Sequence, residues 1–362
     1  MKLKIFNLSV IIACIAIFIF SIPRCDARNP SKIKGNKNIL IKDIPISDYD
    51  KIVISNVFDV EYSQSPNAPR LQVETDENIF IFIDIQVKEK TLYIDVRKNE
   101  PNANNTIRLL PTKLIVRTNS MELISISKLG SSSFTFMNEF TSKKLVINQM
   151  GSGSFTFLQK LQIDQFRLIA TGSGTFNMMR EVQCQNIQIN KVGSGTILFN
   201  QIVKTKEIDL TLSGPGNIQM REGMVSEKLN VNQSGSGNIT IDKSADIKNL
   251  ILNKIGSGNF NAENVIECKV LSVSQIGSGN VNLTGKFNDG QFNISGSGNV
   301  QAEKSIFDTF FCSIVGSSSV TVTVINELKC NITGSGKLTY KGNPSVISEQ
   351  ILGSGKIIQI PK

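Results

Sequence analysis

Apolar residues along most of the chain fall in pairs two positions apart, and these pairs repeat in groups of three. In the segment that follows Gly151 the pairs are Phe155 and Phe157, Leu161 and Ile163, and Phe166 and Leu168. A spacing of two is the period of a β-strand that buries one of its faces. The pattern therefore predicts three short strands in this segment, each with alternate side chains directed inward.

The same group of three pairs recurs along the chain, for example after Gly172 and after Gly256. Each group begins at a Gly-Ser-Gly corner or a close variant, and the first eight corner glycines lie 21 residues apart: Gly130, Gly151, Gly172, Gly193, Gly214, Gly235, Gly256 and Gly277. The spacing then shortens to between 18 and 20 residues through Gly296, Gly316, Gly334 and Gly353. Repeats of about this length indicate a solenoid.

These observations predict an all-β chain that forms a single parallel β-helix, a β-solenoid with three short strands per coil of about 21 residues. Right-handed coiling follows from the crossover rule for parallel strands. Helical repeats would need an apolar period of 3.6 residues, and leucine-rich repeats would need an L-x-x-L-x-L frame. Neither pattern is present in the repeats.

The glycines are predicted to be structural corners rather than a phosphate-binding loop. Glycine adopts positive φ without steric penalty, and corners stacked about 4.8 Å apart leave little room for side chains. The glycines assigned this role are Gly151, Gly153, Gly172, Gly174, Gly193, Gly195, Gly235, Gly237, Gly256, Gly258, Gly277, Gly279, Gly296 and Gly298.

Two polar columns follow the corners. The first is predicted to be a ladder of side-chain amides that hydrogen-bond along the stack, and it contains Asn217, Asn238, Asn259, Asn280 and Asn299. The second lies between the members of the first apolar pair and contains Thr156, Asn177, Thr240, Asn261, Asn282 and Thr321. This column is interpreted as a plain solvent-exposed face, and the binding of glycans or of ice by a flat polar ladder is the alternative.

Four cysteines lie in the repeat region. Cys184 and Cys268 occupy one inward column four coils apart, which is too far for a bond, so they are predicted to be small buried hydrophobic residues. Cys312 and Cys330 stand at the same distance before Gly316 and Gly334 and should therefore stack in adjacent coils. A disulfide and two stacked free thiols are both open at this point.

The N-terminal part of the chain differs from the repeats. Residues 1–27 combine two lysines, an apolar run and a proline, which is typical of a cleaved signal peptide, with an uncleaved anchor as the alternative. Residues 28–39 are predicted to be a polar linker. Residues 40–129 keep the strand pattern without Gly-Ser-Gly corners and are interpreted as irregular capping coils, continuous with the repeat β-helix of residues 130–362.

Composition and charge exclude several classes of chemistry. The chain has no histidine, so Ser-His-Asp catalysis and histidine-bound metals are excluded. The segment TGSGKLT lacks the first glycine of a phosphate loop, because Asn331 occupies that position. The acids that could serve catalysis are scattered over different columns: Asp164, Glu181, Glu207 and Glu222. We therefore predict no catalytic residues, no cofactor and no metal site.

The formal net charge of +9 is spread along the chain. No cluster of basic residues alternates with aromatic ones, so a nucleic-acid partner is not expected. Contact with a membrane is expected only through an uncleaved N-terminal segment. The expected role is non-enzymatic adhesion, structure or interaction by a secreted or cell-surface protein, with surface glycans or cell-surface proteins as partners. A polysaccharide-binding or polysaccharide-degrading β-helix enzyme is the alternative.

Several segments resemble the bacterial family called putative auto-transporter adhesin, head GIN domain. They are DYDKIVISNVFDVEYSQ at 48–64, LQVETDENI at 71–79, VKEKTLYIDVRKN at 87–99, the glycine corners, and GSGKLTYKGNPSVISEQILGSGKI at 334–357. The resemblance covers nearly the whole chain after residue 27. It implies a secreted or surface-attached β-solenoid, and no catalytic residues are carried over with it.

Overall fold

The second and third strands expected in each coil run on as one bent element. In the coil after Gly151, strand β13 (Phe155–Phe157) is short, whereas β14 (Leu161–Thr171) is long. Burial alternates along β14 except at Asp164 and Gln165, two consecutive exposed residues that mark an outer corner. All six apolar residues expected to point inward in this coil are buried, which confirms the three inward pairs.

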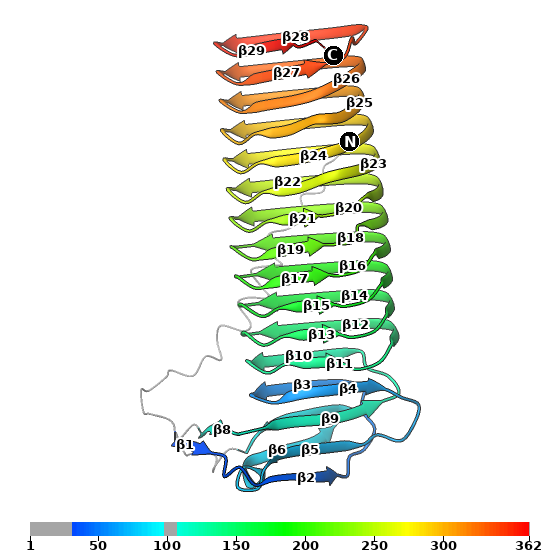
Figure 1. Cartoon of the computed structure of the whole chain (residues 1–362), viewed down its shortest axis with the longest axis vertical. Helices are drawn as coiled ribbons and strands as arrows, with labels where there is room; N and C mark the ends of the chain where they lie inside the picture. The colour runs from blue at the N-terminus through cyan, green and yellow to red at the C-terminus, as the bar shows by residue number, and fades with distance from the viewer. Residues whose placement is uncertain (1–30, 98–106, 362) are drawn as a thin grey trace.

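The computed structural model describes residues 31–97 and 107–361, and over this range the coils stack into a rod (Figure 1). The predicted signal peptide or anchor lies outside the described residues. Within them, no helix is both long enough and apolar enough to cross a membrane.

The coils from β10 onward have the following strands. They are β10 (Ser125–Gly130), β11 (Phe134–Phe136), β12 (Phe140–Met150), β13, β14, β15 (Phe176–Met178), β16 (Val182–Val192), β17 (Thr196–Phe199), β18 (Val203–Ser213), β19 (Asn217–Met220), β20 (Met224–Gly235), β21 (Ile239–Ile241) and β22 (Ala245–Gly256). Further along they are β23 (Phe260–Gly277), β24 (Val281–Gly296), β25 (Val300–Gly316), β26 (Ser319–Gly334), β27 (Lys337–Lys341), β28 (Val346–Gly353) and β29 (Lys356–Gln359).

Each strand pairs in parallel with its equivalent one coil further on. In β14 and β16, for example, Leu161 lies opposite Val182 and Phe166 opposite Ile187. Side chains of one type therefore form columns along the rod, and the predicted parallel β-solenoid is confirmed. The shorter coils near the C-terminus are accommodated by a register shift at an outer corner, as between Ala262 and Ile266 in β23.

The N-terminal region mixes stacked strands with antiparallel ones. Strands β3 (Lys51–Asn56) and β4 (Asp59–Gln64) stack in parallel on β10 and β11. The other elements are β1 (Ser31–Lys34), β2 (Ile39–Ile44), β5 (Leu71–Asp76), the 3-10 helix η1 (Phe80–Phe82), β6 (Ile83–Lys88), β7 (Thr91–Val96), β8 (Ile107–Leu110) and β9 (Leu114–Ser120). Antiparallel pairs β2–β5, β5–β9 and β6–β7 cover this end of the stack.

We expected less regular coils in this region, and the antiparallel pairs differ from that expectation. Strands β6 and β7 are joined by Glu89 and Lys90, which both have positive φ (48° and 56°). Two consecutive residues with positive φ form a tight hairpin turn that is usually built from asparagine and glycine. Because this turn uses neither residue, its sequence carries no hairpin signal.

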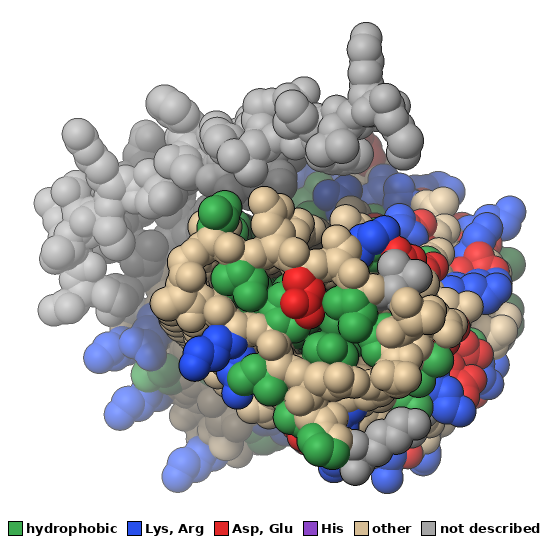
Figure 2. Space-filling model, turned by 90° about the horizontal axis from the view of Figure 1, so that it is seen from above, with side chains coloured by type: hydrophobic (Ala, Val, Ile, Leu, Met, Phe, Trp, Pro, Cys, Tyr) green, Lys and Arg blue, Asp and Glu red, His purple; other side chains and the backbone are tan. Residues whose placement is uncertain are grey.

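The core of the rod consists of columns of apolar side chains. Phe155 stacks between Phe134 and Phe176, with ring centroids 5.4 and 5.0 Å apart, and Phe136 stacks on Phe157 at 4.1 Å. Seen along the axis from the end formed by β28 and β29, apolar side chains gather in the centre around an acidic side chain, and polar groups surround them (Figure 2). Stacking of like residues follows from the equal length of successive coils.

The four cysteines of the repeat region are free, buried thiols. The Cys184 thiol donates to the main-chain oxygen of Asn186, and the Cys268 thiol donates to that of Val270, both at 3.1 Å. Cys312 lies directly opposite Cys330 on adjacent strands. A hydrogen bond between these two thiols, together with burial, raises the pKa of Cys312 well above its ordinary value. The disulfide between Cys312 and Cys330 stays a prediction.

Oxidation of Cys312 and Cys330 to a disulfide should stabilise the C-terminal coils by about 3 kcal/mol, because the bond closes a loop of about 18 residues in the unfolded chain. Folded thiols with a raised pKa react slowly, so the bond should form during oxidative folding. Denaturant unfolding with and without reductant measures the difference. A Cys184→Ala/Cys268→Ala variant should keep it. Recovery of only unlinked peptides after oxidative refolding would contradict the prediction.

Candidate functional site

The two glycines of each corner are required for different reasons. The first has positive φ, as in Gly256 (φ 110°), and the others predicted are Gly151, Gly172, Gly193, Gly235, Gly277 and Gly296. The second is buried, as in Gly258, and the others predicted are Gly153, Gly174, Gly195, Gly237, Gly279 and Gly298. A Cβ atom at Gly258 would lie 2.0 Å from the Gly237 carbonyl oxygen of the previous coil. Coils can therefore stack closely at this edge.

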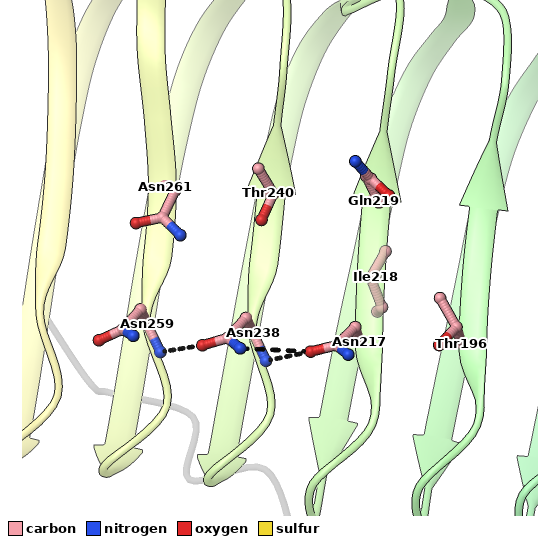
Figure 3. A pocket seen from close by; sticks show the side chains of 8 residues that line it. All are labelled: Thr196, Asn217, Ile218, Gln219, Asn238, Thr240, Asn259 and Asn261. Atoms are coloured by element: carbon pink, nitrogen blue, oxygen red, sulfur yellow. Dashed lines mark hydrogen bonds between the residues drawn. The ribbon is translucent and has the colours of Figure 1, made fainter.

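The amide column consists of the five asparagines that follow the second corner glycine. Each Oδ1 atom accepts a hydrogen bond from the main-chain N–H of the next coil. The distances from Asn217, Asn238, Asn259, Asn280 and Asn299 are 3.0, 2.9, 2.8, 3.1 and 3.1 Å. The ladder was predicted to consist of hydrogen bonds between side-chain amides. In this column such a bond runs from Asn238 Nδ2 to Asn217 Oδ1 at 3.4 Å (Figure 3). The ladder is thus held mainly by main-chain donors.

This arrangement determines which atoms the amide column presents to solvent. A main-chain N–H can only donate, so the atom that faces it must be the amide oxygen, and the NH2 group must lie on the other side. Among the described residues, the Nδ2 atoms of Asn259, Asn280 and Asn299 have no acceptor within hydrogen-bonding distance. The half-buried amide column is therefore a row of donors repeated at the coil spacing of about 4.8 Å.

A second polar column runs beside the amide column, two residues further along each strand. Its half-buried polar members are Thr156, Asn177, Gln219, Thr240, Asn261, Asn282 and Thr321, and Leu198 interrupts it between Asn177 and Gln219. Asn282 Nδ2 donates to Asn261 Oδ1 at 2.8 Å, so part of this column is also connected between coils. We call the two columns together the polar face.

The polar face contains a shallow hollow of about 480 Å³ between β17 and the start of β23. Its lining consists of Thr196, Asn217, Ile218, Gln219, Asn238, Thr240, Asn259 and Asn261 (Figure 3). None of these side chains titrates near neutral pH, and amides and hydroxyls provide all its polar groups. The hollow can therefore offer hydrogen bonds to a ligand but no proton transfer by a side chain.

An inner column of polar side chains supports the polar face from the core, and sequence reasoning missed it. Its members stand two residues before a corner glycine and are buried: Lys128, Gln149, Lys191, Gln233, Lys254 and Gln275. Gln233 Nε2 donates to the main-chain oxygens of Gly237 (2.5 Å) and Asn259 (3.1 Å). Gln275 Nε2 donates to the Gly279 oxygen at 2.6 Å. These bonds hold the peptide groups that carry the amide column.

The sequence does contain a signal for the inner column. Inward-facing and outward-facing positions keep alternating after the third apolar pair, so the residue two positions before each corner glycine should also face inward. A search for apolar residues passes over lysine and glutamine at that position.

The two buried ammonium groups of Lys128 and Lys254 lose protons more readily than ordinary lysines. Burial lowers the pKa of each to about 8. Removing an ammonium group from water disfavours its charged form, and the Asp59 carboxylate opposes this effect only in part at Lys128.

The scattered acids form no shared site in the structure. Glu181 and Glu207 pair with lysines of the next coil, Lys204 at 2.9 Å and Lys228 at 2.6 Å, whereas Asp164 and Glu222 are exposed. Within residues 31–97 and 107–361, no group of three or more acidic or cysteine side chains is placed to hold a metal ion.

Comparison with solved structures finds bacterial proteins of similar length. A putative lipid binding protein from Parabacteroides distasonis is 27% identical over 91% of this chain and 100% of its own, with a TM-score of 0.32. A putative adhesin from Parabacteroides merdae is 20% identical over 91% and 99%, with a TM-score of 0.31. A putative adhesin from Bacteroides fragilis is 18% identical over 91% and 100%, with a TM-score of 0.31.

No curated protein matches the chain. The assignment to a family rests instead on a family model that matches residues 48–249 and, in a second, overlapping match, residues 229–344. The two matches include the N-terminal strands from β3 onward, the coils as far as β27 and the whole polar face. The chain therefore belongs to the family described as putative auto-transporter adhesin, head GIN domain.

Proposed function

We propose that the protein is a non-enzymatic adhesin, located outside the cell or on its surface, whose polar face binds extended polysaccharides. The observation that carries the proposal is the amide column, in which every oxygen is bonded to the next coil and the Nδ2 atoms of Asn259, Asn280 and Asn299 have no acceptor among the described residues. Family membership supports an adhesion role. The signal-like character of residues 1–27 supports export.

The geometry suits a long ligand better than a small one. A single amide hydrogen bond contributes only about 1 kcal/mol net, because the free groups are already hydrated. A polymer that lies along the rod can bond to many coils at once, and each further contact is intramolecular and so costs less entropy. Sugar hydroxyl and ring oxygens accept hydrogen bonds, which matches the donors of the amide column.

The chemistry of the hollow favours binding over cleavage. Glycoside hydrolysis ordinarily needs two carboxyl groups on either side of the bond that breaks. Among the described residues, the hollow is lined by amides, hydroxyls and one isoleucine. A polysaccharide held there would meet no general acid in the lining.

Replacing Asn259 with aspartate should weaken polysaccharide binding about fivefold or more without unfolding the protein. An aspartate oxygen can still accept the N–H of Asn280, as Asp59 Oδ1 accepts the N–H of Ser133 at 2.8 Å. The substitution removes one amide donor and adds a negative charge, a change of about 1 kcal/mol or more in binding. Biolayer interferometry against immobilised polysaccharides measures the effect.

The matched control is Asn253→Asp, because Asn253 is an exposed asparagine that bonds to Asn232 outside the polar face. It should bind polysaccharides as the wild type does. Equal affinity of both variants would place the ligand elsewhere, and sustained release of oligosaccharides by the wild type would contradict a non-enzymatic role.

A further inference from the structure

The amide column continues into a cationic end. Ser319, whose N–H bonds to Asn299, lies opposite Lys337 of β27, and Lys337 lies opposite Lys356 of β29. Both lysine side chains are exposed. The row of amide donors is therefore extended by one hydroxyl and then by two ammonium groups in the same column.

The two ammonium groups form an unfavourable pair. Residues directly opposite each other on neighbouring strands are about 5 Å apart, and like charges in such positions repel. Their neighbour Lys341, also in β27, is paired with Glu303 at 2.6 Å. Among the described residues, neither Lys337 nor Lys356 has an acidic side chain within ion-pair distance, so the repulsion between them is not offset within the chain.

The opposite end of the same column has the reverse character. It begins at Asp59, whose carboxylate accepts the N–H of Ser133, and continues through the hydroxyl residues Ser133, Ser154, Thr175 and Thr196. A negatively charged ligand group would be repelled near Asp59 and attracted near Lys356. The column is thus electrically polarised along the rod.

We infer that the ligand of the polar face is an acidic polysaccharide whose carboxylates lie against Lys337 and Lys356 while its neutral oxygens accept hydrogen bonds from the amide column. The inference rests on the proposed function and specifies its ligand class. Carboxylates relieve the repulsion between the two ammonium groups, and a repeating sugar backbone follows the repeating amides. The overall positive charge of the chain, +9, acts in the same direction at long range.

A pair of polymers with the same backbone tests the inference: polygalacturonate and its fully methyl-esterified form. The wild type should bind the acid form about tenfold more tightly at low salt, as expected for two partly exposed ion pairs. The preference should decrease with added sodium chloride. Lys337→Met/Lys356→Met should lose the preference and keep its affinity for the ester.

The matched control is Lys143→Met/Lys144→Met, which removes the same charge from two exposed lysines at an outer corner of the rod. It should keep the preference for the acid form, and thermal unfolding checks that both variants are folded. Equal binding of both polymers by the wild type would overturn the acidic ligand class and leave the proposed function intact. Loss of the preference in both variants would also overturn the inference. If the wild type binds neither of these polymers nor any of the immobilised polysaccharides, the proposed function itself is overturned.

Discussion

Replacing Phe155 with alanine is expected to lower the free energy of unfolding by about 4 kcal/mol, near the middle of the range for phenylalanine in a packed core. Phe155 is fully buried, and its ring stacks on Phe134 in the previous coil and on Phe176 in the next. Because coils contact only their neighbours, the truncation weakens both interfaces of its coil at once. Guanidinium unfolding followed by circular dichroism measures the loss.

Phe311→Ala is the matched control, since it makes the same chemical change on the surface. Phe311 is 36% exposed, and Lys329 Nζ lies 4.9 Å from the centre of its ring. A cation–π contact at such a site contributes about 0.5–1 kcal/mol, so this variant should lose no more than about 1 kcal/mol. Equal losses in the two variants would mean that the phenylalanine column does not hold the coils together.

Replacing Gly258 with serine should cost about 3 kcal/mol, the upper part of the usual range for overpacking. The new Cβ atom would lie 2.0 Å from the Gly237 oxygen and 2.6 Å from Gln233 Nε2. The main chain must shift, and Gln233 must give up the bonds that it makes beneath the amide column. The neighbouring Ser257→Ala, a change at an exposed position of the same corner, should stay within about 0.5 kcal/mol of the wild type.

A later coil suggests how this cost can be reduced. Ser318 occupies the position equivalent to Gly258, and the inner position before the preceding corner is Ile294 instead of a glutamine. Gly258→Ser combined with Gln233→Ile recreates that pair. We expect the double variant to be less destabilised than the sum of the two single variants by at least about 0.5 kcal/mol. Strict additivity would show that Gln233 and the corner do not interact.

The N-terminal region of residues 40–129, which covers one end of the rod, could be predicted only in part. Its strands were visible as alternating runs, but the antiparallel pairing of β6 with β7 depends on the turn at Glu89 and Lys90. Turn conformation at such residues is decided by the strands that pack on either side. The shortened coils could also be predicted only in part. The spacing of the corner glycines shows that these coils have fewer residues, but only the strand pairing shows where the register shifts.

The sequence by itself determined the coil length, the three inward pairs, the glycine corners and the positions of the asparagines. These features are repeated and local, so each coil carries the same information. Only the tertiary structure decided that the Asn259 oxygen bonds to the next coil's main chain, that Gln233 reaches its carbonyl acceptors from inside, and that Lys337 and Lys356 extend the row of donors. A hydrogen bond or a charge interaction depends on which groups lie within a few ångströms, and in this rod those groups belong to neighbouring coils about twenty residues apart along the chain.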